Sequence, residues 1–249
     1  MDYIWMLKLI SLLLLVDLGS PETFKFYEYI TDEKDWRHYG YISPVQNQGE
    51  CQASWAMSVV GALEAHTAIN NHELVELSAQ QLIDCAPHPN NGCHEGKTND
   101  AFHYIGDHGI ASKASYPYRA VQSNCSYNSN STAGRMKFLV TYLNSDEKRL
   151  TELVYNIGPV VAHIDNQHES FLEYKSGIYH EENCRSDMEN LTLPVLVVGY
   201  GTDCKNGSYW ILKTSFGLNW GENGYMRLAR NKGNMCGVST LLEYPYVEK

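Results

Sequence analysis

The first half of the chain carries apolar residues at helical spacing. Residues 54–69 contain no proline and one glycine, and they place Trp55, Val59, Leu63 and Thr67 on one face. Residues three to four positions apart share one side of an α-helix, so this pattern predicts a buried central helix. Shorter helices are predicted at residues 78–83 and 99–108.

The second half of the chain has short apolar runs separated by turn-forming residues, which is typical of β-strands. The predicted strands cover residues 137–142, 160–164, 195–200, 209–213 and 224–228. There are no internal repeats or low-complexity tracts. The pattern predicts an α+β fold, in which a helical lobe (about residues 35–136) packs against a β-rich, barrel-like lobe (about residues 137–249) across a cleft.

The N-terminus carries an apolar run that is too short to span a bilayer. Residues 4–18 are mostly apolar, with Lys8 as an interruption. This arrangement is typical of a secretory signal, so we predict a signal peptide at residues 1–20, followed at residues 21–34 by a short pro-remnant or N-terminal extension. A buried N-terminal helix is the less favoured alternative, because the core SLLLLV has no amphipathic period. The mature chain is expected to be secreted and extracellular, with no membrane attachment.

The composition is that of an ordinary globular protein. Of 249 residues, 43% are hydrophobic and 19% are charged, and the formal net charge is −10. A phosphate-binding surface relies on clustered Lys and Arg, so this acidic balance argues against nucleic acid as a partner. A cationic partner stays open, although an acidic surface more commonly serves solubility.

Seven cysteines and four glycosylation sequons agree with an extracellular location. The odd number of cysteines predicts three disulfides and one cysteine left over, but spacing alone does not give the pairing. The sequons begin at Asn124, Asn130, Asn190 and Asn206.

One segment combines cysteine, serine and tryptophan in a recognisable order. Residues 45–58 read VQNQGECQASWAMS, which resembles the active-site segment of papain-family cysteine peptidases. Cys51 matches the first cysteine of that signature, and Trp55 closes it. The position of the nucleophilic cysteine is occupied by Ser54.

The other two positions of the catalytic triad also depart from the family pattern. In the family, a strand resembling VLVVGYG follows the catalytic histidine, and residues 195–201 supply that strand here. The histidine position two residues earlier holds Leu193, within the interval of about 130–150 residues after the nucleophile that the signature allows. The family segment KNSWG is here KTSFG, so Thr214 replaces the asparagine and Phe216 the tryptophan.

The resemblance covers nearly the whole chain from Asp35 onward. Further matches are LIDC, YPY, IGPVV, SGIY and NWGENGY. The tail LLEYPYV and the variant CHEG resemble the group 1 mite allergens most. The resemblance implies a papain-like two-lobe fold in a peptidase domain at residues 35–249. Family members carry a long pro-region, and its absence here fits either a truncated gene model or a protein with no activity to restrain.

Further residue roles are implied by the resemblance. The implied disulfides are Cys51–Cys93, Cys85–Cys125 and Cys184–Cys236, which leave Cys204 as the free thiol. Gln48 takes the place of the side chain that donates to the oxyanion. The residues implied for the substrate cleft are Glu95, Gly96, Leu241, Phe216 and Trp220. Gly96 can still pair with a peptide backbone.

Three functions compete for this pattern. A serine nucleophile needs a base in hydrogen-bond contact, and Leu193 accepts no proton. We therefore expect a secreted, catalytically inactive papain-like protein that acts by binding a protein or peptide, for example as a decoy or host-directed factor. The first alternative is a weak serine-variant peptidase that uses Ser54 with His163. The second is a structural or storage role.

His163 falls where family members place a small apolar residue that lines the pocket for the second substrate side chain. The simpler interpretation is that it fills this pocket, because the geometry that a base requires would be fortuitous. The sequence indicates no cofactor and no metal, and we expect a monomer.

Overall fold

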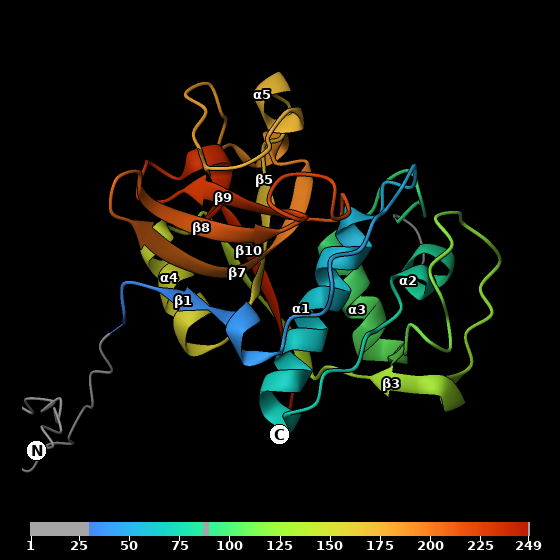
Figure 1. Ribbon diagram of the computed structural model, residues 1–249. Coiled ribbons are helices and arrows are strands. Elements are labelled where there is room, and N and C mark those ends of the chain that lie inside the picture. Colours follow the sequence, from blue (N-terminus) through green and yellow to red (C-terminus); the bar gives the residue numbers. More distant parts are fainter. Residues whose placement is uncertain (1–29, 87–89, 249) are drawn as a thin grey trace, which may run out of the picture.

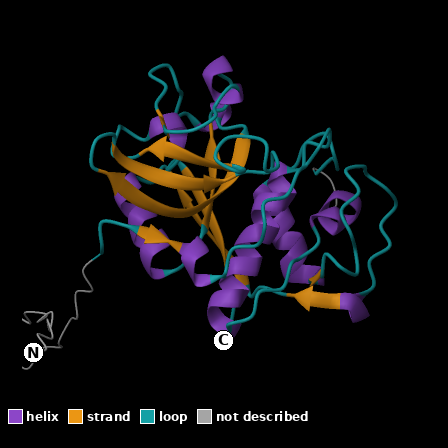
Figure 2. Ribbon diagram, viewed as in Figure 1, coloured by secondary structure: helices purple, strands orange, loops and turns teal. Residues whose placement is uncertain are grey.

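The computed structural model describes residues 30–86 and 90–248, and it places them in two lobes (Figure 1). The predicted signal peptide at residues 1–20, and the predicted extension up to residue 29, lie outside the described residues. Figure 2 shows one group of helices on one side of the molecule and most strands on the other, with further helices packed around the strands. The predicted α+β fold is confirmed.

The helical lobe is built around α1 (Ser54–Asn71), with α2 (Ala79–Cys85) and α3 (Thr98–His108) beside it. Apolar burial continues around α1 rather than along one face, because this helix also packs on β5, β7 and β10 of the other lobe. The helix therefore lies at the junction of the two lobes, and its first residue is Ser54.

The second lobe is an eight-stranded sheet within the described residues. Its strand order is β4 (Phe138–Leu143), β10 (Leu241–Tyr246), β5 (Val160–Ile164), β7 (Leu193–Asp203), β8 (Gly207–Lys213), β9 (Tyr225–Ala229) and β6 (Ile178–Tyr179), and β1 (Lys34–Asp35) pairs with β7. The pairs are antiparallel except for β6 with β9. A separate small sheet joins β2 (Ile110–Ala111) to β3 (Thr132–Gly134).

Helices and short turns complete the lobes. They are α4 (Glu147–Asn156), α5 (Glu169–Leu172), η1 (Trp36–Tyr39), η2 (Ser129–Ser131), η3 (Met188–Asn190) and η4 (Met235–Gly237). The sequence pattern did not predict α4 or β10. The start of α4 has a clear signal, because the Asp146 side chain accepts from the backbone N–H of Arg149 and so caps the helix.

Alternation along the strands divides the apolar side chains between two cores. On β7, Leu193, Val195 and Val197 belong to the core of the β-rich lobe. Leu196 and Val198 lie on the opposite face and join the core around α1. The faces of β5, β7 and β10 that look toward α1 are therefore the ones that can contribute side chains to a cleft between the lobes.

Three disulfides fasten the loops of this frame: Cys51–Cys93, Cys85–Cys125 and Cys184–Cys236. These are the pairs that the resemblance implies. Cys204 is exposed and free. Each bridge closes a loop of 40 to 52 residues, and such a crosslink contributes about 2–4 kcal/mol by restricting the unfolded chain.

Candidate functional site

Ser54 begins α1 with its side chain half-buried at the junction of the lobes. The residue before it is Ala53, whose side chain makes no capping hydrogen bond. The first N–H groups of a helix have no partner within the helix, and they favour negative charge. The backbone around Ser54 therefore suits an oxygen that gains charge during a reaction.

The loop that leads to Ser54 is fixed to the neighbouring loop at residues 90–98. Besides the Cys51–Cys93 disulfide, the backbone N–H of Gln52 donates to the carbonyl oxygen of Cys93 at 2.8 Å. The indole N–H of Trp55 donates to the carbonyl oxygen of Gly92 at 3.3 Å. These contacts hold the start of α1 against one wall of the cleft.

Gln48 is fixed from three directions. Its backbone N–H donates to the carbonyl oxygen of Ser215 at 2.8 Å, and its side-chain oxygen accepts from the Ser215 hydroxyl at 2.6 Å. The hydroxyl of Tyr118 donates to the carbonyl oxygen of Gln48 at 2.8 Å. Burial raises the pKa of Tyr118 to about 12, so this hydroxyl keeps its proton as a donor. The amide oxygen of Gln48 is engaged, which directs its amide nitrogen away from Ser215.

Two pockets share Ser54 as a wall. The smaller one has room for about one water molecule, at 20 Å³, and is also lined by Lys213, Thr214 and Ser215. The larger one, at 330 Å³, runs between residues 95–99 on one side and β5, β7 and β10 on the other. It is the size of a ligand pocket and is the cleft of this molecule.

Gly96 forms part of the wall of this cleft. A side chain at this position would overlap the ring of Trp55, so only glycine lets the backbone lie so close to the start of α1. The carbonyl of Glu95 and both backbone groups of Lys97 are already bonded within the protein, but the N–H and carbonyl of Gly96 make no hydrogen bond to a described residue and can pair with an extended peptide.

The inner end of the cleft holds three polar side chains from three elements. Thr98 begins α3, His163 lies on β5, and Glu243 lies on β10. The His163 Nε2 atom lies 2.9 Å from the Thr98 hydroxyl oxygen and 3.6 Å from Glu243 Oε2, and the Thr98 hydroxyl donates to the same carboxylate oxygen. The side chain of Glu243 is only 1% exposed.

Comparisons with known proteins decide the family. The family model described as "Papain family cysteine protease" matches residues 30–246. The chain belongs to the papain family of cysteine proteases. It is 44% identical over 224 residues to a "Cathepsin L-like" protein of Caenorhabditis elegans and 43% identical over 215 residues to a "Cathepsin L-like peptidase" of Aedes aegypti.

These relatives are longer than this chain. The alignments cover 89% and 86% of this chain but only 66% and 63% of the two relatives. "Cathepsin S" of Mus musculus is 43% identical, with 92% of this chain and 68% of the relative covered. The chain therefore spans about two thirds of the length of the curated relatives that it matches.

Solved structures confirm the papain-like fold. The digestive procathepsin L 3 of Tenebrio molitor larval midgut superposes with a TM-score of 0.82 at 38% identity, over 89% of this chain and 72% of that one. The bromelain protease from Ananas comosus, solved in complex with the E64 inhibitor, gives a TM-score of 0.80 at 32% identity, over 88% and 100%.

The prediction of an inactive protein that acts only by binding is wrong by this comparison. Relatives at 41–44% identity carry the names cathepsin L, R and S, and the matching structures are named proteinases and proteases. Nothing in these similarities indicates an inactive member. The prediction gave full weight to three residue positions and too little to the family as a whole.

The papain-family frame brings some predicted site residues together and not others. Ser54, Glu95, Gly96, His163 and Leu241 all line the cleft. Thr214 lines the smaller pocket, and its hydroxyl donates to the carbonyl oxygen of Gly224 at 2.9 Å. The aromatic pair Phe216 and Trp220 packs together and on Phe171 in the β-rich lobe.

Leu193 does not line either pocket that Ser54 lines within the described residues. Its side chain is 5% exposed and packs into the core of the β-rich lobe, whereas the next residue, Pro194, lines both pockets. Side chains alternate along a strand, so the two residues face opposite sides of β7. On β5, the residue opposite Pro194 is His163, which brings an imidazole to the cleft side of the sheet.

The cleft residues that sequence reasoning missed include Thr98 and Glu243. A signal for Glu243 exists, because it is a lone acid in the apolar run LLEYPYV. Sequence reasoning also missed the buried Glu64, which accepts from the Ser43 hydroxyl at 2.5 Å while Lys213 donates to Ser43 at 2.9 Å. Burial raises the pKa of Glu64 and lowers that of Lys213.

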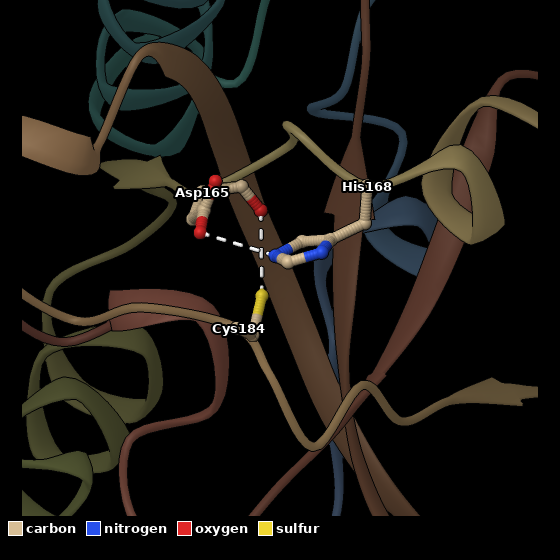
Figure 3. A group of neighbouring side chains, drawn as sticks. All are labelled: Asp165, His168 and Cys184. Carbon is tan, nitrogen blue, oxygen red and sulfur yellow. Dashed lines mark hydrogen bonds and ion pairs between the residues drawn. The ribbon is translucent and has the colours of Figure 1, made fainter.

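One further cluster combines residue types that ligate metals. Figure 3 shows Asp165, His168 and Cys184 converging at the end of β5. The sulfur of Cys184 is bonded to Cys236, however, and a thiolate is the form of cysteine that binds metal. Arg185 also occupies both carboxylate oxygens of Asp165. The cluster therefore holds the chain together and is not a metal site.

The four predicted glycosylation sites differ in exposure. Asn124, Asn130 and Asn206 are exposed, and Asn190 is partly buried. Among the residues that the structure describes, no helix is both long and apolar enough to cross a bilayer.

Proposed function

We propose that this papain-family chain is a cathepsin L-like peptidase in which Ser54 is the attacking group. In this proposal Ser54, Leu193 and Thr214 stand at the positions of the catalytic cysteine, histidine and asparagine. The observation that carries it is the place of Ser54, at the uncapped start of α1 and in one cleft with Gly96 and His163. The names of the relatives support peptide hydrolysis as the reaction class.

The reaction follows from the groups around Ser54. The hydroxyl oxygen attacks the peptide carbonyl carbon, its proton passes to a base, and the carbonyl oxygen becomes an oxyanion. The backbone N–H of Ser54 and the side-chain amide of Gln48 are the donors proposed for that oxyanion. The amine product leaves with the proton, and water then hydrolyses the acyl ester on Ser54.

His163 is the proposed base. It is the only histidine that lines the cleft in the described part of the chain, and its Nε2 atom is engaged with Thr98. Ser54 and His163 make no hydrogen bond to each other within the described residues, so the proton must pass through the other ring nitrogen or a water molecule. Turnover is therefore expected to be slow compared with a preformed pair of nucleophile and base.

Further parts of the proposal concern the setting of the protein. Export to an oxidising compartment is supported by the apolar run at residues 4–18 and by the three disulfides. We also propose glycans at the sequons, a monomeric state, and a closer similarity to group 1 mite allergens that rests on the tail and the CHEG segment. The partner is the peptide substrate, and no cofactor takes part in the steps above.

The test is turnover of fluorogenic peptides by the purified, disulfide-bonded protein and by Ser54→Ala. We expect slow hydrolysis that Ser54→Ala abolishes, and no labelling of residue 54 by a thiol-directed epoxide, because the thiolate with which such a reagent reacts is absent from this position. Hydrolysis that survives Ser54→Ala, or none with any peptide of a diverse library, would contradict the proposal.

A further inference from the structure

The inner end of the cleft holds a buried carboxylate with an open side. Glu243 is 1% exposed, and its Oε2 atom accepts from the Thr98 hydroxyl and faces His163 at 3.6 Å. Its Oε1 atom accepts no hydrogen bond from any described residue, although Glu243 lines the cleft. Oε1 is not one of the fully buried side-chain atoms that lack a partner, so it opens into the cleft and can accept from a ligand there.

At this end of the pocket, the groups that remain free for a ligand can only accept hydrogen bonds, as the placement of the hydrogen atoms shows. The single hydroxyl hydrogen of Thr98 points to Glu243 Oε2, because an ionised carboxylate only accepts. The His163 Nε2 atom, 2.9 Å from the same hydroxyl oxygen, must then carry a hydrogen and donate. In a neutral imidazole this leaves Nδ1 as an acceptor. Glu243 Oε1 and His163 Nδ1 thus both lack a donor.

The net charge of the side chains that line the pocket is negative, which also favours a ligand that donates hydrogen bonds. Among the residues that line the cleft, exposed Glu95 and Lys97 at its mouth offset each other. Glu243 remains as the charge that is shielded from water. A charge in this setting acts over the pocket with little screening.

We propose that this pocket selects peptides with a lysine or arginine side chain, which enters it and donates to Glu243 Oε1. This inference rests on the proposed peptide-binding function and names its substrate class. A basic side chain supplies several donors and the opposite charge at once. An apolar side chain of similar length would leave the carboxylate buried and unpaired.

The experiment measures peptide binding without turnover, in the Ser54→Ala protein. Fluorescently labelled peptides form a positional set in which one residue at a time is lysine, arginine, norleucine or glutamate. We expect one position at which lysine and arginine bind about tenfold or more tighter than norleucine, and glutamate binds weakest.

Two substitutions locate this preference. Glu243→Gln keeps the shape and the Thr98 contact but removes the charge, so the preference should fall to within about twofold. Asp100→Asn is the matched control, because it removes one charge from the same end of α3 at a residue that does not line the cleft. It should keep the full preference. Thermal unfolding of both variants checks that they fold.

Each outcome is decisive. Equal or tighter binding of norleucine at every position in the otherwise unchanged protein would overturn the selectivity and leave the peptide cleft intact. A preference that persists in folded Glu243→Gln would place the selecting group elsewhere and also overturn it. If no peptide of the set binds, the proposed function itself fails.

Discussion

Two buried carboxylates of the β-rich lobe have opposite surroundings. Asp165, at the end of β5, is fully buried and accepts from Arg185 with both oxygens, from the backbone N–H groups of Gln167 and Arg185, and from His168. Glu243, on β10, is as deeply buried but accepts from Thr98 alone. Both oxygens of Asp165 have donors within the protein, whereas Oε1 of Glu243 has none among the described residues and is the atom that we propose to accept from a ligand.

His66 and His163 also differ in whether their ring nitrogens have partners within the protein. His66 on α1 is buried, donates to the carbonyl oxygen of Pro159 at 2.8 Å and stacks on Tyr244 at 5.7 Å. Its burial lowers the pKa of the imidazole to about 4. His163 lines the cleft and has a ring nitrogen to spare. Polar groups whose hydrogen bonds are all made within the protein stabilise its structure. Polar groups in a cleft that keep a free donor or acceptor indicate binding or catalysis.

The largest expected effect separates the two histidines by activity. His163→Ala should lower kcat for peptide hydrolysis by about 10²–10⁴, because it removes the proposed base. His66→Gln should leave kcat near pH 7 unchanged, because it keeps a donor for Pro159 and lies outside the cleft. Steady-state kinetics on one peptide measures both. A loss of kcat in His66→Gln with none in His163→Ala would reverse the comparison.

The next effect separates the two carboxylates by stability. Asp165→Asn should lower the free energy of unfolding by about 3 kcal/mol, because it leaves Arg185 and the neighbouring N–H groups without their acceptor. Glu243→Gln should cost less than about 1 kcal/mol, because the new amide oxygen still accepts from Thr98. Urea unfolding at pH 7 gives both numbers. Equal losses would mean that Glu243 is structural as well.

The pH dependence of the free energy of unfolding should be set by the buried groups whose hydrogen bonds are made within the protein, His66 and Asp165. His66 is neutral in the folded protein down to about pH 4 but takes up a proton near pH 6.5 when unfolded. The unfolded state binds more protons between these values, so stability falls as the pH drops from about 6.5 to 4, by up to about 3 kcal/mol. His66→Gln should flatten this part of the curve. A wild-type curve that is already flat there would show that His66 titrates normally.

Below about pH 4, a further loss of stability is expected from protonation of Asp165. Burial opposes ionisation of this carboxyl, but the hydrogen bonds from Arg185 outweigh it and hold the pKa of Asp165 well below its usual range. Because the folded pKa is depressed, the stability it contributes is present above about pH 3.9 and is lost as the pH falls further. Asp165→Asn should lack this additional acid loss.

The smallest effect concerns the thiol outside the three bridges. Alkylation of the native, unreduced protein followed by peptide mapping should mark Cys204 alone, because it is exposed and the other six cysteines are bridged. Cys204→Ser should change the free energy of unfolding by less than about 0.5 kcal/mol. Labelling of Cys51 or Cys93 would mean that the loop before Ser54 is not fastened as described.

The main helix and strands could be predicted from the sequence because the signals for these elements are local. The period of residues 54–69 and the short apolar runs after residue 137 correspond to α1 and to the main strands. The family resemblance placed Ser54 and Gly96 on the cleft. The direction of single side chains was harder to predict. Neither Leu193 facing the core nor Glu243 meeting Thr98 across the cleft can be read from a motif, because strand parity and contacts between distant segments decide them.

The most direct test of the central claim is to find the acyl group. The protein is incubated briefly with a lysine-containing peptide ester, quenched in acid, and analysed by intact mass and peptide mapping. Attack by the Ser54 hydroxyl releases the alcohol and leaves the peptide acyl group on that oxygen. The account predicts one added acyl group, located on Ser54 and absent from Ser54→Ala. An acyl group on another residue, or on none while the ester is consumed, would contradict it.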